Sequence, residues 1–243
     1  RAVQSGANAT MESLFGDAEA VKPTEPALPP SEPWPVRDRL KKEREYLNFY
    51  ISGHPLQEHA IDVSSFSTLL LHKLDPALHG QTVRLCGIVG DIRTRLDKRE
   101  NTIAFVKIEQ YVGSCECVMW SDKYRQFQSA LAPDAVLVAV GKCEINGDNV
   151  KIIVDELMTL DQARKKLSKG YVVRIQPDQV SSEQLIAVKQ RCGSSDAQDR
   201  LTFCVQRPDG MAIYDAMTPI KVSDDTTSFL IATFGEQNIR FAV

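Results

Sequence analysis

The chain has 243 residues, of which 43% are hydrophobic and 25% are charged, and its formal net charge is −3. This composition is ordinary for a globular protein and is sufficient for more than one compact unit. The acidic balance argues against a domain that binds duplex DNA mainly through its overall charge. No apolar run could span a bilayer, and the first residues lack the apolar core of a signal peptide, so we expect a cytoplasmic protein without a membrane partner.

Residues 1–35 are expected to form a flexible N-terminal segment. Six of the chain's twelve prolines lie between Lys22 and Pro35, a composition that favours an extended, polyproline-type linker. Ahead of it stands one short apolar cluster, Met11-Glu12-Ser13-Leu14-Phe15. The cluster is either an end with incidental apolar residues or a short linear motif whose Leu14 and Phe15 dock into a partner.

Residues 36–78 are expected to form a helical connector. From Val36 to Ser52 apolar residues recur at helical spacing opposite a charged face, which predicts an amphipathic helix. Its apolar stripe is Val36, Leu40, Leu47, Tyr50 and Ile51. Gly53 stands where a C-terminal cap belongs, His54 is interpreted as a packed or capping residue, and a second helical stretch is expected within Leu56–Leu74.

Residues 79–160 show alternating apolar patterns separated by turn signals. We expect strands at Gln81–Asp91, Thr102–Glu109, Cys115–Trp120, Ala135–Ile145 and Val150–Leu160, and a helix at Ser121–Leu131 with Ser121 as N-cap. Asn146-Gly147-Asp148-Asn149 suits a tight hairpin. Three strands, a helix and a hairpin are the order of a five-stranded oligonucleotide-binding (OB) barrel, whose open face commonly binds single-stranded nucleic acid. An unrelated small β-barrel or sandwich is the alternative.

A basic stretch connects the first two expected strands. Between Gln81 and Arg99 there are five basic residues and two acidic ones, although the chain as a whole is acidic. We therefore expect contacts with single-stranded DNA through the phosphates and by stacking. The candidate DNA-binding residues are Arg93, Arg95, Lys98 and Arg99 in the loop, with Phe105 and Lys107 on the exposed face of the second strand. The alternative is a solvated hairpin connection.

Residues 161–243 are expected to form a C-terminal α+β domain. A short helix at Asp161–Lys169, with Asp161 as N-cap, is followed by strand, helix, two strands, helix and strand. This order predicts a domain of the split β-α-β type. From Ile175 onward it carries six basic and nine acidic residues, so a protein partner suits it better than DNA. The expected fold class of the chain is α+β, mainly β in its barrel.

The reactive residue types form no recognisable catalytic or metal-binding pattern. The cysteines, at 86, 115, 117, 143, 192 and 204, lack a CxxC pair or a matched histidine spacing. We interpret them as buried reduced thiols without a disulfide or zinc, although Cys115 and Cys117 face the same way and a metal site is conceivable. The carboxylates are dispersed, so we expect neither two-metal phosphoryl transfer nor a cofactor in this chain.

Three sequence stretches resemble the C-terminal region of the bacterial DNA polymerase III alpha subunit. They are EREYLNFYISGHPL at Glu43–Leu56, GIVGDIRTRLDKR at Gly87–Arg99 and DELMTLDQAR at Asp155–Arg164. The first resembles the family's E-x-E-x-L-G-x-Y-L-x-G-H-P segment, with Asn48 and Ile51 as departures. The last 70 or so residues resemble the family's tau-binding domain only in element order and position.

The resemblance implies several partners. In the family a pentapeptide such as Q-x-D-M-F or Q-x-S-L-F binds the sliding clamp, and here Met11, Ser13, Leu14 and Phe15 stand at that place, with Met11 instead of glutamine. It also implies single-stranded template DNA at the barrel, the clamp-loader tau subunit at the C-terminal domain, and further replisome subunits. The polymerase palm of a longer DNA-directed DNA polymerase would lie upstream of Arg1.

Other classes of protein remain open at this point. The barrel could be a protein-interaction module without DNA binding, or belong to a fragment of another nucleic-acid enzyme such as a tRNA synthetase. A specialised, error-prone relative of the polymerase is a further alternative.

Overall fold

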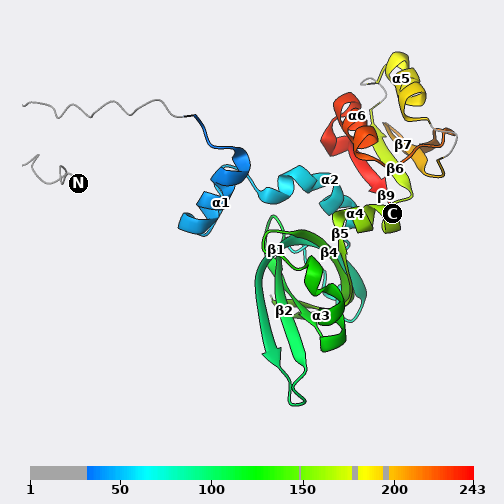
Figure 1. The fold of residues 1–243 in the computed structure, drawn as a ribbon. Helices are drawn as coiled ribbons and strands as arrows, with labels where there is room; N and C mark the ends of the chain where they lie inside the picture. Colours follow the sequence, from blue (N-terminus) through cyan, green and yellow to red (C-terminus); the bar gives the residue numbers. More distant parts are fainter. Residues whose placement is uncertain (1–31, 148, 177–179, 194–196) are drawn as a thin grey trace, which may run out of the picture. The chain divides into compact units, whose positions relative to one another are not determined.

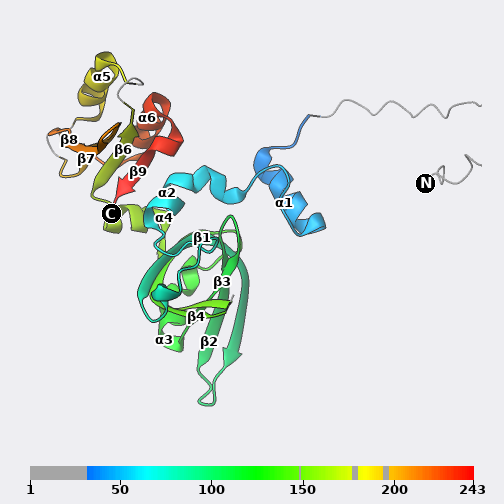
Figure 2. The same cartoon turned by 180° about the vertical axis from the view of Figure 1, so that it is seen from behind.

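The computed structural model describes residues 32–147, 149–176, 180–193 and 197–243 (Figures 1 and 2). The apolar cluster at 11–15 and the proline-rich stretch up to residue 31 lie outside the described residues. Residues Arg37–Val243 form one compact unit, which contains the barrel and the C-terminal domain. No helix among the described residues is long and apolar enough to cross a membrane.

The first helix is shorter than the sequence predicts. Helix α1 covers Val36–Leu47 and ends at Asn48, which has the positive φ of 62° that commonly terminates a helix. The predicted continuation to Ser52 and the cap at Gly53 are therefore wrong. The predicted apolar stripe is also wrong, because Leu40 is the one buried residue of α1, whereas Val36 and Leu47 are exposed.

His54 caps the next helical element, as predicted. The 3-10 helix η1 covers Pro55–His59, and the Nδ1 atom of His54 accepts a hydrogen bond from the backbone N–H of Leu56 at 3.1 Å. The imidazole also packs against the rings of Tyr50 and Tyr111, at centroid distances of 5.2 and 5.1 Å. Helix α2, Ala60–Phe66, confirms the second helical stretch, and η2, Pro76–Leu78, precedes the barrel.

Five strands form a closed OB barrel, which confirms the predicted fold class. They are β1 Thr82–Leu96, β2 Thr102–Glu109, β3 Ser114–Met119, β4 Val136–Asn146 and β5 Asn149–Thr159. Their order around the barrel is β1-β2-β3-β5-β4, and only the β3–β5 pair is parallel among these strands. The barrel closes tightly where Gly87 of β1 crosses β2, since a Cβ there would lie 2.5 Å from the carbonyl oxygen of Glu109.

Two predicted boundaries in the barrel are wrong. Strand β1 continues to Leu96 instead of ending at Asp91, because Arg93, Arg95 and Leu96 pair with β2. The expected charged loop is therefore mostly a strand. Helix α3 covers only Ser121–Phe127, followed by the 3-10 helix η3, Gln128–Ala130, and its N-cap position is Trp120 rather than Ser121.

The C-terminal domain has the predicted order of elements. It comprises α4 Leu160–Leu167, β6 Gly170–Ile175, α5 Ser182–Cys192, β7 Arg200–Arg207, β8 Gly210–Asp215, α6 Asp224–Phe234, η4 Glu236–Asn238 and β9 Ile239–Ala242. The sheet order is β8-β7-β6-β9. The split arrangement is wrong, because β6 and β7 pair directly and in parallel, with no strand between them. The N-cap of α4 is Thr159, which forms a capping box with Gln162, rather than Asp161.

A shared core joins the C-terminal domain to the outside of the barrel. Phe66 of α2 stacks on Phe241 of β9 at 5.4 Å, and both belong to one buried cluster with Cys86 and Met158 from the barrel strands. Arg164 of α4 holds Asp62 of α2 through two hydrogen bonds of 2.7 and 2.8 Å. Arg164 therefore has a structural role, because it joins α4 to α2.

Candidate nucleic-acid interface

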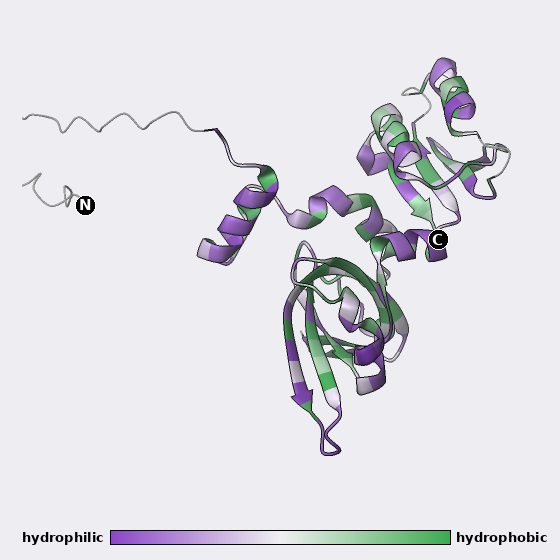
Figure 3. Ribbon diagram, viewed as in Figure 1, coloured by the Kyte–Doolittle hydropathy of each residue, from purple (hydrophilic) through white to green (hydrophobic). Residues whose placement is uncertain are grey.

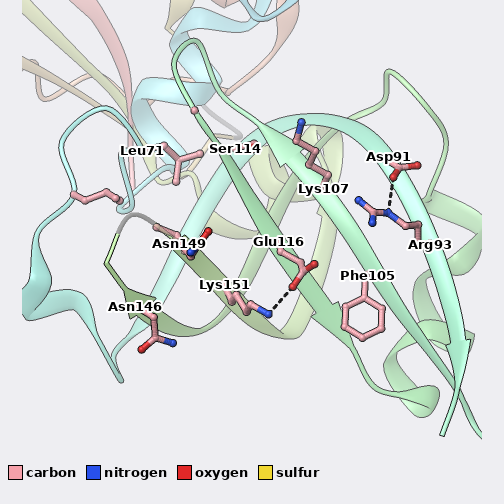
Figure 4. A pocket seen from close by; sticks show the side chains of 13 residues that line it. Leu71, Asp91, Arg93, Phe105, Lys107, Ser114, Glu116, Asn146, Asn149 and Lys151 are labelled. Carbon is pink, nitrogen blue, oxygen red and sulfur yellow. Dashed lines mark hydrogen bonds and ion pairs between the residues drawn. The ribbon is translucent and has the colours of Figure 1, made fainter.

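A groove crosses the outer face of the barrel over β1, β2, β3 and β5 (Figure 4). Its volume is about 820 Å³, and we call it the outer-face groove. It is lined by Leu71, Leu74, Asp91, Arg93, Phe105, Lys107, Gly113, Ser114, Glu116, Asn146, Asn149, Val150 and Lys151. The tight hairpin between β4 and β5, predicted from its Asn-Gly sequence, thus forms one wall.

Strand alternation places the groove residues on the outside. On β2, Ala104, Val106 and Ile108 are fully buried inside the barrel, so Phe105 and Lys107 point to the opposite face. This confirms the two faces predicted for the strand.

Pairing between strands brings the predicted residues together. Arg93 of β1 lies opposite Phe105, and Lys107 lies opposite Glu116 of β3. The guanidinium of Arg95 lies 5.9 Å from the centre of the Phe105 ring, close enough for a cation–π contact. The ring and the two arginines therefore form one continuous surface next to the groove.

Every cation that lines the groove has a carboxylate partner. Arg93 Nε lies 2.6 Å from Asp91 Oδ2, and Lys151 Nζ lies 2.8 Å from Glu116 Oε1, as the dashed lines in Figure 4 show. Lys107 Nζ lies 2.9 Å from Glu109 on the same strand. The hydrogen bond to Glu116 raises the pKa of Lys151, so this side chain stays charged at neutral pH.

Glu109 joins the edge of the groove to helix α1. Its carboxylate oxygen Oε1 binds both Lys107 and Arg44, each at 2.9 Å, and its side chain is only 12% exposed. Burial by itself raises the pKa of Glu109, but the hydrogen bond from Lys107 and the charge of Arg44 outweigh it, and the net pKa is lowered. Glu109 is therefore ionised and fixes Lys107 in place.

The end of the β1–β2 hairpin carries two further cations. Lys98 and Arg99 are exposed in the turn, which is held by Asp97, whose carboxylate accepts hydrogen bonds from the backbone N–H groups of Arg99 and Asn101 at 2.7 and 2.8 Å. Figure 3 shows this end as hydrophilic. No ion pair to Lys98 or Arg99 occurs within the described residues.

The six predicted DNA-binding residues thus fall into three positions. Arg93, Phe105 and Lys107 line the outer-face groove, and Arg95 covers the Phe105 ring. Lys98 and Arg99 lie at the hairpin turn and do not line the groove. The predicted clamp-binding residues Met11, Ser13, Leu14 and Phe15 lie outside the described residues.

Sequence reasoning missed the opposite side of the groove. Glu116 and Lys151 meet only because β3 and β5, which are far apart in the chain, pair in parallel. The available signal was the alternation of β5, in which Asn149 and Lys151 are exposed on either side of the buried Val150. That alternation predicts which face of the strand each residue occupies, but it does not predict which strand lies next to β5.

The described residues hold no group of three or more metal-ligating side chains that could bind an ion. Cys115 and Cys117 are buried inside the barrel, and a hydrogen bond between the two thiols together with burial raises the pKa of the Cys117 thiol. All six cysteines are free thiols, five of them buried and Cys204 partly exposed. Their placement agrees with the interpretation as packed thiols.

The barrel matches a known family of domains. A family model described as an OB-fold nucleic acid binding domain matches residues 83–160, which correspond to the barrel. At greater length the chain is similar to DNA polymerase III subunit alpha: it is 29% identical to that of Neisseria meningitidis serogroup A over 214 residues, and 25% identical to that of Escherichia coli K12 over 181 residues. These matches cover 85% and 73% of this chain, but only 18% and 16% of the relatives, so the chain spans less than a fifth of their length.

The chain also has weak similarity to solved structures. The wild-type single-stranded DNA binding protein from Thermus aquaticus is 15% identical with a TM-score of 0.28, and the match covers 32% of this chain and 39% of that one.

Proposed function

We propose that this chain is the C-terminal part of a bacterial replicative DNA polymerase and that its barrel binds single-stranded template DNA in the outer-face groove. One observation carries the proposal: Phe105 lies among the cations Arg93, Lys107 and Lys151 on the open face of an OB barrel. An aromatic ring stacks on any base and cations contact any phosphate, so binding without sequence preference is expected. Similarity to the alpha subunit over most of the chain supports the polymerase parent.

The proposed role is positional rather than catalytic. The groove would hold the template strand, while the polymerase chemistry would reside in the remainder of a longer parent chain in the cytoplasm. No cofactor is needed for this part. Each phosphate contact makes binding more sensitive to salt. For single strands, it changes the slope of log K against log salt concentration by about −0.7.

The test is fluorescence anisotropy with a labelled oligothymidylate at several salt concentrations. Phe105→Ala should weaken binding by about 5- to 160-fold, the range given by a stacking contribution of about 1–3 kcal/mol per base. Lys98→Ala/Arg99→Ala should lower the salt slope by about 0.7 for each phosphate that the variant no longer neutralises. The matched control is Lys221→Ala/Arg240→Ala, which removes one lysine and one arginine from exposed positions of the C-terminal domain.

An OB module that binds protein alone is a second candidate. The specific observation in its favour is that each cation in the groove is already paired with a carboxylate. The same titration separates the two functions. Absence of single-strand binding at low salt, or equal losses in the Phe105 and control variants, would refute the DNA proposal.

A further part of the proposal concerns the sliding clamp. Met11, Ser13, Leu14 and Phe15 would form the linear motif, with Leu14 and Phe15 as apolar anchors, and a tether of this kind raises the effective concentration of the enzyme on DNA. Calorimetry with the cognate clamp should show saturable binding that Leu14→Ala/Phe15→Ala abolishes. No heat of binding from the unmutated chain would refute the motif.

The C-terminal domain is proposed to bind the clamp-loader tau subunit and so to connect the chain to other replisome subunits. A second groove, of about 370 Å³, supports a protein partner, because Leu185, Ile186, Phe203 and Tyr214 contribute to its largely apolar lining. Surface plasmon resonance with immobilised tau is the measurement. Ile186→Asp should abolish binding, and binding unchanged by this substitution would exclude the groove as the contact.

A further inference from the structure

Two ion pairs of the outer-face groove lie where a ligand would bind. Asp91 and Glu116 line the groove themselves and hold Arg93 and Lys151, so each pair presents an anion and a cation to the same ligand. A phosphate that approaches Arg93 or Lys151 therefore meets a competing carboxylate within 2.6 or 2.8 Å of the cation.

These pairs do little for the stability of the fold. The side chains of Arg93 and Asp91 are 67% and 56% exposed, and those of Lys151 and Glu116 are 45% and 39% exposed. Ion pairs at such exposure are weak because water screens them. They are weak enough for a DNA phosphate to displace the carboxylate.

The cations of the β1–β2 hairpin outside the groove have no carboxylate partner among the described residues. Arg95 contacts the Phe105 ring rather than a carboxylate, and the described residues give Lys98 and Arg99 no ion-pair partner either. The hairpin end therefore keeps its positive charge, while the groove is close to neutral. Single-stranded DNA would be attracted to the hairpin end. Within the groove its phosphates would have to replace Asp91 and Glu116 as the partners of Arg93 and Lys151.

We propose that Asp91 and Glu116 are internal competitors of DNA, which neutralise Arg93 and Lys151 in the empty groove and keep its affinity for single strands low. This inference rests on the proposed function of the groove. A strand bound by such exchange is released readily, because each carboxylate returns to its cation as the phosphate leaves. Low affinity in the groove suits a template strand that must move.

The test compares the full chain with Asp91→Asn, Glu116→Gln and the double variant, by anisotropy with an oligothymidylate at low salt. Each single substitution should tighten binding roughly two- to fivefold, the factor that corresponds to releasing one exposed ion pair. The double variant should show the product of the two gains. The control is Asp209→Asn in the exposed turn between β7 and β8, which changes the net charge equally.

A second arm separates release of a specific cation from a general charge effect. When Arg93→Gln is combined with Asp91→Asn, the gain in DNA affinity from Asp91→Asn should disappear. Arg93→Gln should reduce the affinity of the wild-type chain by a much smaller factor than it reduces the affinity of Asp91→Asn. Equal affinity of Asp91→Asn, Glu116→Gln and Asp209→Asn, with wild-type binding intact, would overturn this inference alone. Absence of binding by all variants would refute the proposed function itself.

Discussion

Arg164→Met should strongly destabilise the protein, because it leaves a buried carboxylate without its partner. Asp62 has a side chain only 3% exposed and receives hydrogen bonds from Arg164 Nε and Nη2 at 2.7 and 2.8 Å. Removing one member of a buried pair costs about 3–5 kcal/mol. We expect the lower end, about 3 kcal/mol, because the Arg164 side chain is 25% exposed and His59 lies 4.0 Å from the carboxylate.

Urea unfolding followed by circular dichroism measures this loss of free energy. Lys165→Met is the matched control: Lys165 is the next residue of α4, is exposed, and should change the stability by less than about 0.5 kcal/mol. Asp62→Asn combined with Arg164→Met should recover about 1 kcal/mol relative to the sum of the single losses, because no unpaired charge remains. If Arg164→Met costs no more than Lys165→Met, the pair does not join α4 to α2.

Four further predictions concern single positions. Burial lowers the pKa of His54 below its ordinary 6.5. The contribution of neutral His54 to stability is therefore complete above pH 6.5 and is lost as the pH falls through the lowered pKa of the folded state. Melting curves from neutral to acidic pH should show this loss in the wild type and not in His54→Asn. Asn48→Ala should cost about 1 kcal/mol and Asn48→Gly less, by urea unfolding, because the φ of 62° is unfavourable for alanine. Gly141→Ala should cost at least about 1–3 kcal/mol in the same assay, because its Cβ would overlap the backbone of β5; an unchanged midpoint would contradict the close approach. A thiol reagent should label partly exposed Cys204 first in the native protein, because burial raises the pKa of thiols such as Cys86; equal rates for all cysteines would contradict this packing.

The sequence by itself determined the elements whose signals are local. Alternation placed Phe105 and Lys107 on the outer face of β2, and the Asn-Gly pair marked the hairpin between β4 and β5. His54 was interpreted as a packed or capping residue, and it both caps η1 and packs against two tyrosine rings. The alternation, the turn and the cap depend on residues within a few positions of one another, so period and turn chemistry suffice to find them.

Only the tertiary structure decided which strands are neighbours. The extension of β1 to Leu96 depends on pairing with β2, and the direct contact of β6 with β7 depends on how α5 returns the chain to the sheet. Glu116 and Lys151 are 35 residues apart in sequence, yet they pair on neighbouring strands in the groove. Arg164 of α4 pairs with the buried carboxylate of Asp62, which lies about one hundred residues earlier in the chain. In each case the partner lies far away in the chain. Local sequence patterns do not predict which distant segments pair or in which register.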